Sequence, residues 1–291
     1  MRTSPESVKE FCKVSLAREV LPEIHAMADV LRRRHPGAVA VLAYGSCLRG
    51  VAVVSTLMDF YVLTENFASV SPNIISRLAC CIVPPNVYYA EMEFEGQHLR
   101  AKYALLPLPQ FSKWMSLRTS NPYFWARFSQ PSALVYTRDE NIQNEVIASI
   151  SEALRTGFAN AKSLTDETDA LAIWIAGFNA TYQSEFRSEN ANRATSIVSD
   201  EPGYYRQAAR LLASETSIHA NQALRRLTGK GWSILRLIKA AFTFQGGADY
   251  IVWKIERHSG EKIILTEWQR EHPIVAGLLL LPALLRKGAV R

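Results

Sequence analysis

The sequence has few of the residues on which disulfide-rich and zinc-binding proteins depend. Only 4 of its 291 residues are cysteine, at positions Cys12, Cys47, Cys80 and Cys81, and they form no CxxC pair. The histidines do not cluster at the spacing of a zinc site. We expect the adjacent Cys80 and Cys81 to pack against apolar neighbours rather than to form a bridge. This cysteine usage indicates a reducing compartment.

Long apolar stretches are also missing. No run reaches the roughly 20 apolar residues that a membrane-spanning helix needs. The first residues, MRTSPESVKEFCK, lack the apolar region of a secretory signal. The chain contains no internal repeat and no low-complexity tract. Because 48% of the residues are hydrophobic and 21% are charged, the sequence predicts a folded protein. Its length of 291 residues predicts one large or two modest domains.

Acidic residues are in the minority. Lys and Arg number 33 against 27 Asp and Glu, which gives a formal charge of +6 and a pI near 9.2. An excess of this sign suits a polyanionic partner such as a nucleotide, a nucleic acid or an anionic lipid surface. Many ordinary soluble proteins have a similar excess, so charge alone does not choose among these partners.

The hydrophobic pattern predicts strands early in the chain and helices later. The predicted strands are 38–44, 56–64, 87–94 and about 98–106, the last two joined as a hairpin by a turn at Glu95-Gly96. The predicted helices are 5–35, 72–83, 110–130, 139–162, 166–186, 204–228 and 232–244, with a loop at 187–203. This order predicts an α+β fold, with strands in residues 1–137, a mainly helical domain in residues 138–270 and an apolar, basic tail in residues 271–291.

The stretch AYGSCLRGVAVVSTLMDFYV, residues 43–62, combines a Gly-Ser turn with one carboxylate. A turn after a buried strand can present backbone N–H groups and a hydroxyl to phosphates, which is the role expected of Gly45 and Ser46. Asp59 lies in an apolar strand, where a carboxylate is costly unless a cation or a donor meets it. These residues predict a nucleotidyl-transfer site in which Asp59 holds Mg²⁺. Since Gly-Ser ends many strands, a purely structural turn is the alternative.

Other charged residues lie in apolar or strand-forming segments. Lys102, in a hairpin strand, is a candidate phosphate ligand, with a snorkelling lysine as the alternative. Arg127, in the aromatic segment NPYFWARF, would be costly in a core without an anion. Glu91 and Glu93 share one face of their strand, so one of them could add a metal ligand, or both could line a solvated face.

A series of short segments resembles one known family in order and spacing. The segments are YGS at 44–46, MDFYV at 58–62, NVYY at 86–89, AKY at 101–103, FWARFSQP at 124–131, IAGFNATYQSEFR at 175–187 and SILRLIKAAFTFQGG at 233–247. They resemble the mitochondrial-type phosphatidate cytidylyltransferases, which make CDP-diacylglycerol and belong to the polymerase β nucleotidyltransferase superfamily. In this family the position two after the metal-binding aspartate is commonly not acidic, so Tyr61 fits the resemblance.

The resemblance implies a polymerase β-like mixed sheet with flanking helices, followed by a helical domain. It implies a Mg²⁺ ion on Asp59 and in-line attack of phosphatidic acid on the α-phosphorus of CTP, which releases pyrophosphate. The residues implied for the CTP site are Tyr44, Gly45, Ser46, Lys102 and Arg127. The catalytic residues implied are Asp59, Lys102 and Arg127, and those near the lipid phosphate are Glu185, Arg187 and Lys239. No nucleic acid partner is expected.

The sequence departs from the family pattern at several positions. Cys47 and Ala126 replace glycines, Glu185 replaces an aspartate, and the segment TENFASVSPN is shorter than the family's histidine-containing loop. These changes concern the nucleotide lid and the choice of base. Two other functions therefore stay open: a nucleotidyltransferase with a protein, RNA or small soluble acceptor, and a catalytically inactive nucleotidyltransferase-like binding module.

The C-terminal tail has an apolar run at 273–285, which contains Pro282 and is followed by Arg286, Lys287 and Arg291. The run is too short to span a bilayer. It predicts either a helix that docks on the core or a peripheral anchor on an anionic membrane surface. The anchor is favoured because the implied acceptor is a lipid, and the expected location is the cytoplasmic side of the inner membrane.

Overall fold

The computed structural model describes residues 7–49, 56–116, 119, 122–184, 193–213, 235, 239 and 266–271. Its centre is a five-stranded sheet in the order β3-β4-β2-β1-β5. The strands are β1 (Ala38–Tyr44), β2 (Met58–Thr64), β3 (Asn86–Phe94), β4 (Gln97–Pro107) and β5 (Ser132–Thr137). Strand β2 pairs with β4 in parallel and the other neighbours pair antiparallel, so the sheet is mixed. The prediction of an α+β fold with a mixed sheet and flanking helices is confirmed.

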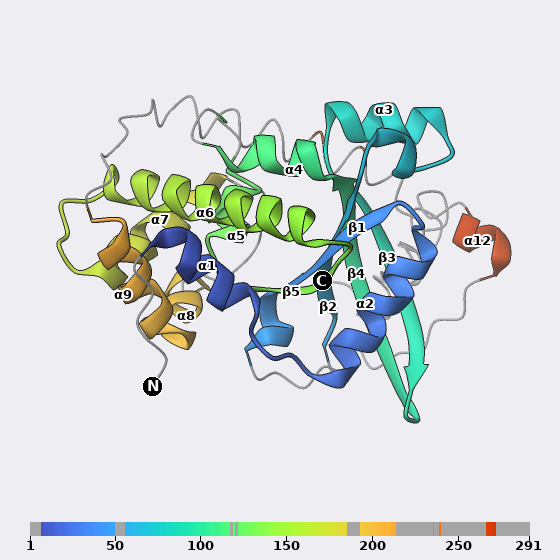
Figure 1. The fold of residues 1–291 in the computed structure, drawn as a ribbon, viewed down its shortest axis with the longest axis horizontal. Coiled ribbons are helices and arrows are strands. Elements are labelled where there is room, and N and C mark those ends of the chain that lie inside the picture. Colours follow the sequence, from blue (N-terminus) through green and yellow to red (C-terminus); the bar gives the residue numbers. More distant parts are fainter. Residues whose placement is uncertain are drawn as a thin grey trace, which may run out of the picture.

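Helices precede, interrupt and follow the strands (Figure 1). The helices before β4 ends are α1 (Val8–Leu16), α2 (Pro22–Arg34) and α3 (Ile74–Ile82). Those after it are α4 (Leu108–Met115), α5 (Trp125–Phe128), α6 (Glu140–Lys162), α7 (Ala170–Ser184), α8 (Arg193–Asp200), α9 (Pro202–Leu211) and α12 (Glu267–Glu271). Two short 3₁₀ turns, η1 (Gly45–Leu48) and η2 (Phe67–Ser69), follow β1 and β2.

Helices cover both faces of the sheet, which explains why the central strands are almost wholly apolar. Helix α2 packs across the strands on one face, and α4 and α5 pack on the face that carries Tyr61. The ring of Tyr61 is fully buried there, with its centroid 4.8 Å from that of Phe128 and 6.2 Å from that of Phe111. Tyr61 is therefore a core residue, and it fills the position where a second carboxylate would otherwise lie.

The helices from α6 to α9 form a second group beside the sheet (Figure 1). The buried ring of Trp174 on α7 contacts Phe158 on α6 and Tyr205 on α9, and its Nε1 donates to the carbonyl of Tyr205 at 3.1 Å. Although α1 begins the chain, Arg18 just after it forms a two-pronged ion pair with Glu201, both bonds being 2.9 Å long. The N-terminal helix is thus tied to the later helices.

The strands, the hairpin turn and the helices predicted at 72–83 and 139–162 are confirmed, and the helix predicted at 166–186 is confirmed over Ala170–Ser184. The single helix predicted at 5–35 is wrong, because the chain breaks after α1 and α2 begins at Pro22, a residue suited to the first helical turn. The helix predicted at 110–130 is also wrong, because α4 ends at Met115 and α5 is one turn. Strand β5 was not predicted, and the predicted loop 187–203 contains α8 and the start of α9.

Several predictions concern residues that lie outside the described ranges. The helix predicted at 204–228 is confirmed only as far as Leu211, and the tail at 273–285 is outside them altogether. The domain boundaries after residues 137 and 270 stay predictions. Within the described ranges, no helix has the length and apolar content that crossing a bilayer would require.

Candidate active site

One row of side chains crosses the whole sheet. The backbone register pairs Tyr89 on β3 with Lys102 on β4, Lys102 with Asp59 on β2, Asp59 with Tyr44 on β1, and Tyr44 with Ser132 on β5. Residues paired across neighbouring strands project to the same face of a sheet. The fold therefore brings together Tyr44, Asp59 and Lys102, which the sequence predicted for one site.

Asp59 is the acidic centre of this row. Its side chain is 24% exposed, and its Oδ1 lies 3.3 Å from Nζ of Lys102, whose side chain is 36% exposed. The same Oδ1 is buried and accepts no hydrogen bond within the part of the chain that the structure describes. A charged hydrogen bond is usually 2.7–2.9 Å long. The carboxylate is therefore compensated electrostatically and keeps lone pairs with which it can bind a cation.

The turn at Gly45 lies against the other oxygen of this carboxylate. Gly45 has a φ of +87°, which residues with a side chain rarely adopt. A Cβ at this position would lie 3.3 Å from Oδ2 of Asp59. Glycine thus serves both the backbone turn and the open space beside the carboxylate, and Ser46 follows directly, partly buried in η1.

Cys47, where the family pattern has a glycine, faces the core. Its Sγ lies 3.3 Å from the carbonyl oxygen of Tyr44, to which the thiol donates. Burial raises the pKa of the Cys47 thiol to about 11, although a backbone hydrogen bond from Asp59 acts in the opposite direction. The neutral Cys47 thiol packs on the core side of the turn and donates to its backbone. A cysteine in place of glycine at position 47 therefore leaves the space beside Gly45 open.

Arg127 reaches the row from α5. Its guanidinium lies over the ring of Tyr44, 5.3 Å from the centroid, and over the ring of Tyr123, 4.5 Å from the centroid. Burial raises the pKa of Tyr44 far above its ordinary value, and the negative charge of Asp59 raises it further. Tyr44 is thus neutral, and its ring holds the positive charge of Arg127. The residue paired with Tyr44 on β2 is Asp59.

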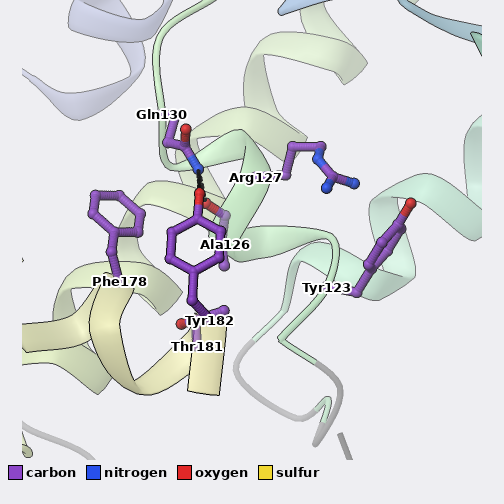
Figure 2. Close-up of a pocket in the computed structure, with 7 residues that line it drawn as sticks. All are labelled: Tyr123, Ala126, Arg127, Gln130, Phe178, Thr181 and Tyr182. Carbon is purple, nitrogen blue, oxygen red and sulfur yellow. Dashed lines mark hydrogen bonds between the residues drawn. The ribbon is translucent and has the colours of Figure 1, made fainter. Parts of the chain in front are cut away.

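A small pocket continues from Arg127 towards α7 (Figure 2). It is lined by Tyr123, Ala126, Arg127, Gln130, Phe178, Thr181 and Tyr182, and Gln130 donates to the hydroxyl of Tyr182 at 3.5 Å. Its volume of about 20 Å³ accommodates about one water molecule. The pocket is too small for a nucleotide base. Its lining shows that α7 lies next to Arg127.

Of the three residues implied for the lipid phosphate, the structure describes only Lys239. Glu185 and Arg187 lie outside the described residues, which end at Ser184 on α7 and resume at Arg193. Lys239 donates to the carbonyls of Val83 and Pro85, at 2.6 and 2.9 Å, and burial lowers its pKa to about 8. These contacts tie Lys239 to the segment just before β3, and its role towards a lipid stays a prediction.

Glu91 and Glu93 lie on β3 towards the hairpin turn, and both side chains are exposed. Glu91 contacts His98 on β4 at 3.1 Å, Glu93 contacts the same imidazole, and the hydroxyl of Tyr89 donates to Glu91 at 3.1 Å. The two acids belong to a solvated strand face. Their exposure fits the solvated-face alternative, and a metal-ligand role for either acid stays a prediction.

In the row of paired residues that crosses the sheet, Asp59 is the one carboxylate, and it would be the residue to hold a Mg²⁺ ion. No set of three or more His, Cys, Asp or Glu side chains within the described ranges is arranged to hold a metal ion. Mg²⁺ is commonly held by one or two carboxylates together with substrate phosphates and water. The unbonded, buried Oδ1 of Asp59 suits such an ion, provided that the ion arrives with a phosphorylated substrate.

Sequence reasoning missed two residues of the site. Tyr123 lies four residues before Arg127, a helical spacing that could have signalled the ring contact. Arg49, just past η1, pairs through Nε with Oδ2 of Asp200 on α8 at 3.0 Å, and its side chain is only 12% exposed. No local pattern announces this pairing, which ties the turn at Gly45 to the helical group.

Comparison with known proteins finds little similarity in sequence. No protein-family model matches the chain, and no curated protein matches it. One similar solved structure is a nucleotidyltransferase-like protein from Exiguobacterium sibiricum 255-15, with 12% identity and a TM-score of 0.28. The similarity covers 91% of this chain and 92% of that chain.

Proposed function

We propose that the chain transfers a cytidylyl group from CTP to phosphatidic acid and so forms CDP-diacylglycerol and pyrophosphate. The observation that carries the nucleotide site is the convergence of Gly45, Asp59 and Lys102: the Asp59 carboxylate lies between an open turn on one side and an ammonium group on the other. A metal–triphosphate complex requires these three contributions. The choice of CTP and phosphatidic acid is supported by the ordered segments from YGS at 44–46 to SILRLIKAAFTFQGG at 233–247.

The proposed complex opens the internal ion pair. Lys102 turns from Asp59 to the phosphates, the backbone of the turn binds phosphate oxygens, and the Ser46 hydroxyl donates to them. Asp59 is then free to hold Mg²⁺, which would neutralise negative charge on the triphosphate. Arg127, stacked on Tyr44, supplies a second fixed positive charge at the edge of the triphosphate.

The transfer step forms one phosphorus–oxygen bond and breaks another. An oxygen of the acceptor phosphate attacks the α-phosphorus of CTP in line, the bond to the bridging α–β oxygen breaks, and pyrophosphate leaves. Lys102 and Arg127 neutralise the charge on the leaving group. A phosphate acceptor is already ionised near neutral pH. It therefore needs no general base, which suits a row of paired residues whose one carboxylate is Asp59.

The acceptor sets the rest of the proposal. Phosphatidic acid resides in a bilayer, so we propose that the protein works peripherally, at the cytoplasmic face of the inner membrane. Glu185, Arg187 and Lys239 are proposed near the lipid phosphate on the strength of the segments that contain them.

A catalytically inactive nucleotide-binding module is the second candidate. The observation that favours it is the salt bridge itself, because Lys102 compensates the charge of Asp59 from within the protein. Such a module would bind CTP but release no pyrophosphate.

The test uses CTP labelled in its α-phosphate, Mg²⁺ and vesicles that contain phosphatidic acid. We expect the wild type to transfer label to lipid and Asp59→Asn to lose at least about 100-fold in rate, as when one transition-state contact is removed. Matched reactions with UTP, ATP and a water-soluble phosphate monoester separate base choice from acceptor choice. Equal rates for wild type and variant, or CTP binding by the wild type without transfer to any acceptor, would refute the enzymatic proposal.

A further inference from the structure

Helix α3 exposes a large apolar face. Ile74, Ile75, Leu78 and Ile82 are 65%, 72%, 57% and 65% exposed, and Cys81 is exposed as well. On a helix with 3.6 residues per turn these positions fall on one side. Figure 1 shows α3 at the margin of the molecule, beyond the end of the sheet. We call this surface the α3 face.

The opposite side of α3 is firmly attached. The side chain of Asn73 caps the helix by accepting two backbone N–H groups, at 2.8 and 3.2 Å. Cys80 is fully buried, and Gln110 on α4 donates to the carbonyls of Cys80 and Cys81 at 3.3 and 3.0 Å. The helix is therefore well anchored with its apolar residues outward, so their exposure belongs to the fold.

The chain around the α3 face is basic. No Asp or Glu occurs between Glu65 and Glu91, a stretch that includes all of α3. None occurs between Glu95 and Asp139 either, a stretch that includes α4. Arg77 lies on α3, and the exposed Lys113 lies on α4 one turn beyond the residue that holds α3. The segments that form α3 and α4 thus combine exposed apolar side chains with basic residues and carry no acid of their own, and an exposed acid that contacts α4 is Glu145 on α6, 3.4 Å from the Ser112 hydroxyl. This composition of α3 and α4 matches the chemistry of an anionic lipid surface.

A second copy of the chain is a poorer occupant. Stable protein–protein interfaces use about 20–30 residues on each side, and α3 has 9 residues. A lipid surface demands less, because an amphipathic helix needs only to sink its apolar side chains about 5–10 Å into the boundary of headgroups and acyl chains.

We propose that the α3 face docks on an anionic phospholipid bilayer by inserting Ile74, Ile75, Leu78 and Ile82. The docking rests on the proposed function only in its purpose, which is to bring the enzyme to a lipid acceptor. The contact itself requires neither CTP nor Mg²⁺. The α3 face is thus a proposed membrane element separate from the C-terminal tail at 273–285, whose own role as an anchor stays a prediction.

Cys81 provides a direct probe. It is exposed on α3, while Cys12, Cys47 and Cys80 are buried, so a thiol-reactive, environment-sensitive dye labels Cys81 selectively. Full-length labelled protein is mixed with vesicles of phosphatidylcholine that contain phosphatidylglycerol. We expect a blue shift, quenching by lipids that carry a quencher in the acyl chain, and weaker binding at high salt. Without the blue shift and the quenching, the insertion of α3 is refuted.

Variants test the side chains. Ile75→Glu/Leu78→Glu should weaken sedimentation with these vesicles at least about tenfold, because two apolar insertions are lost and two charges are repelled. Ile75→Gln/Leu78→Gln should weaken it less, through the apolar part alone. Val14→Glu, a change at a residue 45% exposed on α1, is the matched control and should bind like the wild type.

Equal vesicle binding by wild type and the double glutamate variant would overturn the docking proposal, and so would a dimer in solution that the double variant abolishes. Asp59→Asn separates this proposal from the enzymatic one. We expect it to bind vesicles like the wild type while it fails to transfer label. Transfer to short-chain, dispersed phosphatidic acid without vesicle binding would refute the docking and leave the enzyme intact.

Discussion

Asp59 and Lys102 are direct neighbours in the parallel pairing of β2 with β4, and their charged groups lie 3.3 Å apart. Each group would serve a metal–triphosphate complex, but only after the pair opens. The lysine also neutralises a carboxylate that would repel phosphate. Under the proposed function, binding at this site is a competition between the internal ion pair and an incoming cation and anion.

This competition predicts an effect of Asp59→Asn on binding that differs from its effect on rate. Without Mg²⁺, the variant should bind CTP roughly fivefold more tightly than the wild type, because a negative charge is removed and Lys102 is released. With Mg²⁺, the wild type should gain affinity and the variant should not. Calorimetric titration with CTP, in EDTA and in Mg²⁺, measures both.

Glu65→Gln is the control for this titration, since Glu65 is an exposed acid paired with Arg138 at 3.2 Å. It should show the wild-type response to Mg²⁺. An Asp59→Asn protein whose CTP affinity rises with Mg²⁺ as the wild type's does would show that Asp59 is not the metal ligand.

Gly45→Ala should damage the site more than the fold. Gly45 and Gly96 have similar positive φ values, +87° and +75°, so alanine at either position should cost about 1–2 kcal/mol of unfolding free energy. Only at Gly45 would the new Cβ meet the Asp59 carboxylate, at 3.3 Å, whereas nothing lies within 4 Å at Gly96. Urea unfolding compares the stabilities, and binding of Mg²⁺ with CTP compares the sites.

The pair of variants isolates the contact from the backbone strain. We expect Gly96→Ala to bind CTP like the wild type and Gly45→Ala to bind it at least about tenfold more weakly, a difference of about 1.4 kcal/mol. Equal affinities in the two variants would mean that the space beside Asp59 is not used by the ligand.

The sequence was most informative where one residue contradicted its surroundings. Asp59 in an apolar strand and Arg127 in an aromatic segment were found because a buried charge requires a partner. The row through Tyr89, Lys102 and Asp59 could not be read in the same way. It depends on the parallel pairing of β2 with β4, whose connection includes α3 and β3, and no periodicity within one strand sets that register.

The misassigned helices have a similar cause. Strand β5, with the sequence SALVYT, is short, and it becomes a strand by pairing with β1 nearly a hundred residues earlier. The aromatic segment before it resembles a continuous helix because Phe124 and Phe128 recur at helical spacing. In the structure these rings instead pack against Tyr61 from the N-cap and the last residue of a single helical turn, α5.

His35 should make the protein sensitive to mild acid. It follows α2 and lies with Nε2 3.0 Å from the hydroxyl of Tyr103, and burial, helped by Arg34, lowers its pKa to about 4 from an ordinary 6.5. The unfolded chain therefore binds the proton more readily than the folded one. The stability that the neutral imidazole provides should be complete above pH 6.5 and should decline as the pH falls towards 4.

His35→Gln keeps a hydrogen-bonding group towards Tyr103 without a proton to gain. The unfolding free energy of the wild type minus that of the variant should therefore fall between pH 6.5 and 4 and stay level above 6.5. His25→Gln, at an exposed position on the same helix, is the control and should leave the pH profile unchanged. A flat difference for His35→Gln across this range would contradict the assignment.

The ion pair between Arg49 and Asp200 should stabilise the turn at Gly45 from the helical group. Arg49 is 12% exposed, so Asp200→Asn would leave a largely buried guanidinium without its carboxylate. We expect a loss of about 1–3 kcal/mol in unfolding free energy, somewhat below the range for a fully buried pair because Asp200 is 39% exposed. Chemical denaturation measures this loss.

The exposed pair of Arg138 with Glu65 provides the comparison, since their side chains are 44% and 58% exposed. Glu65→Gln should cost less than about 1 kcal/mol, as surface pairs do. If the Arg49 pair also positions the turn, Asp200→Asn should weaken CTP binding, and Asp200→Glu should restore part of it. A variant that loses stability but binds CTP like the wild type would limit the pair to a structural role, because the turn would then hold its shape without α8.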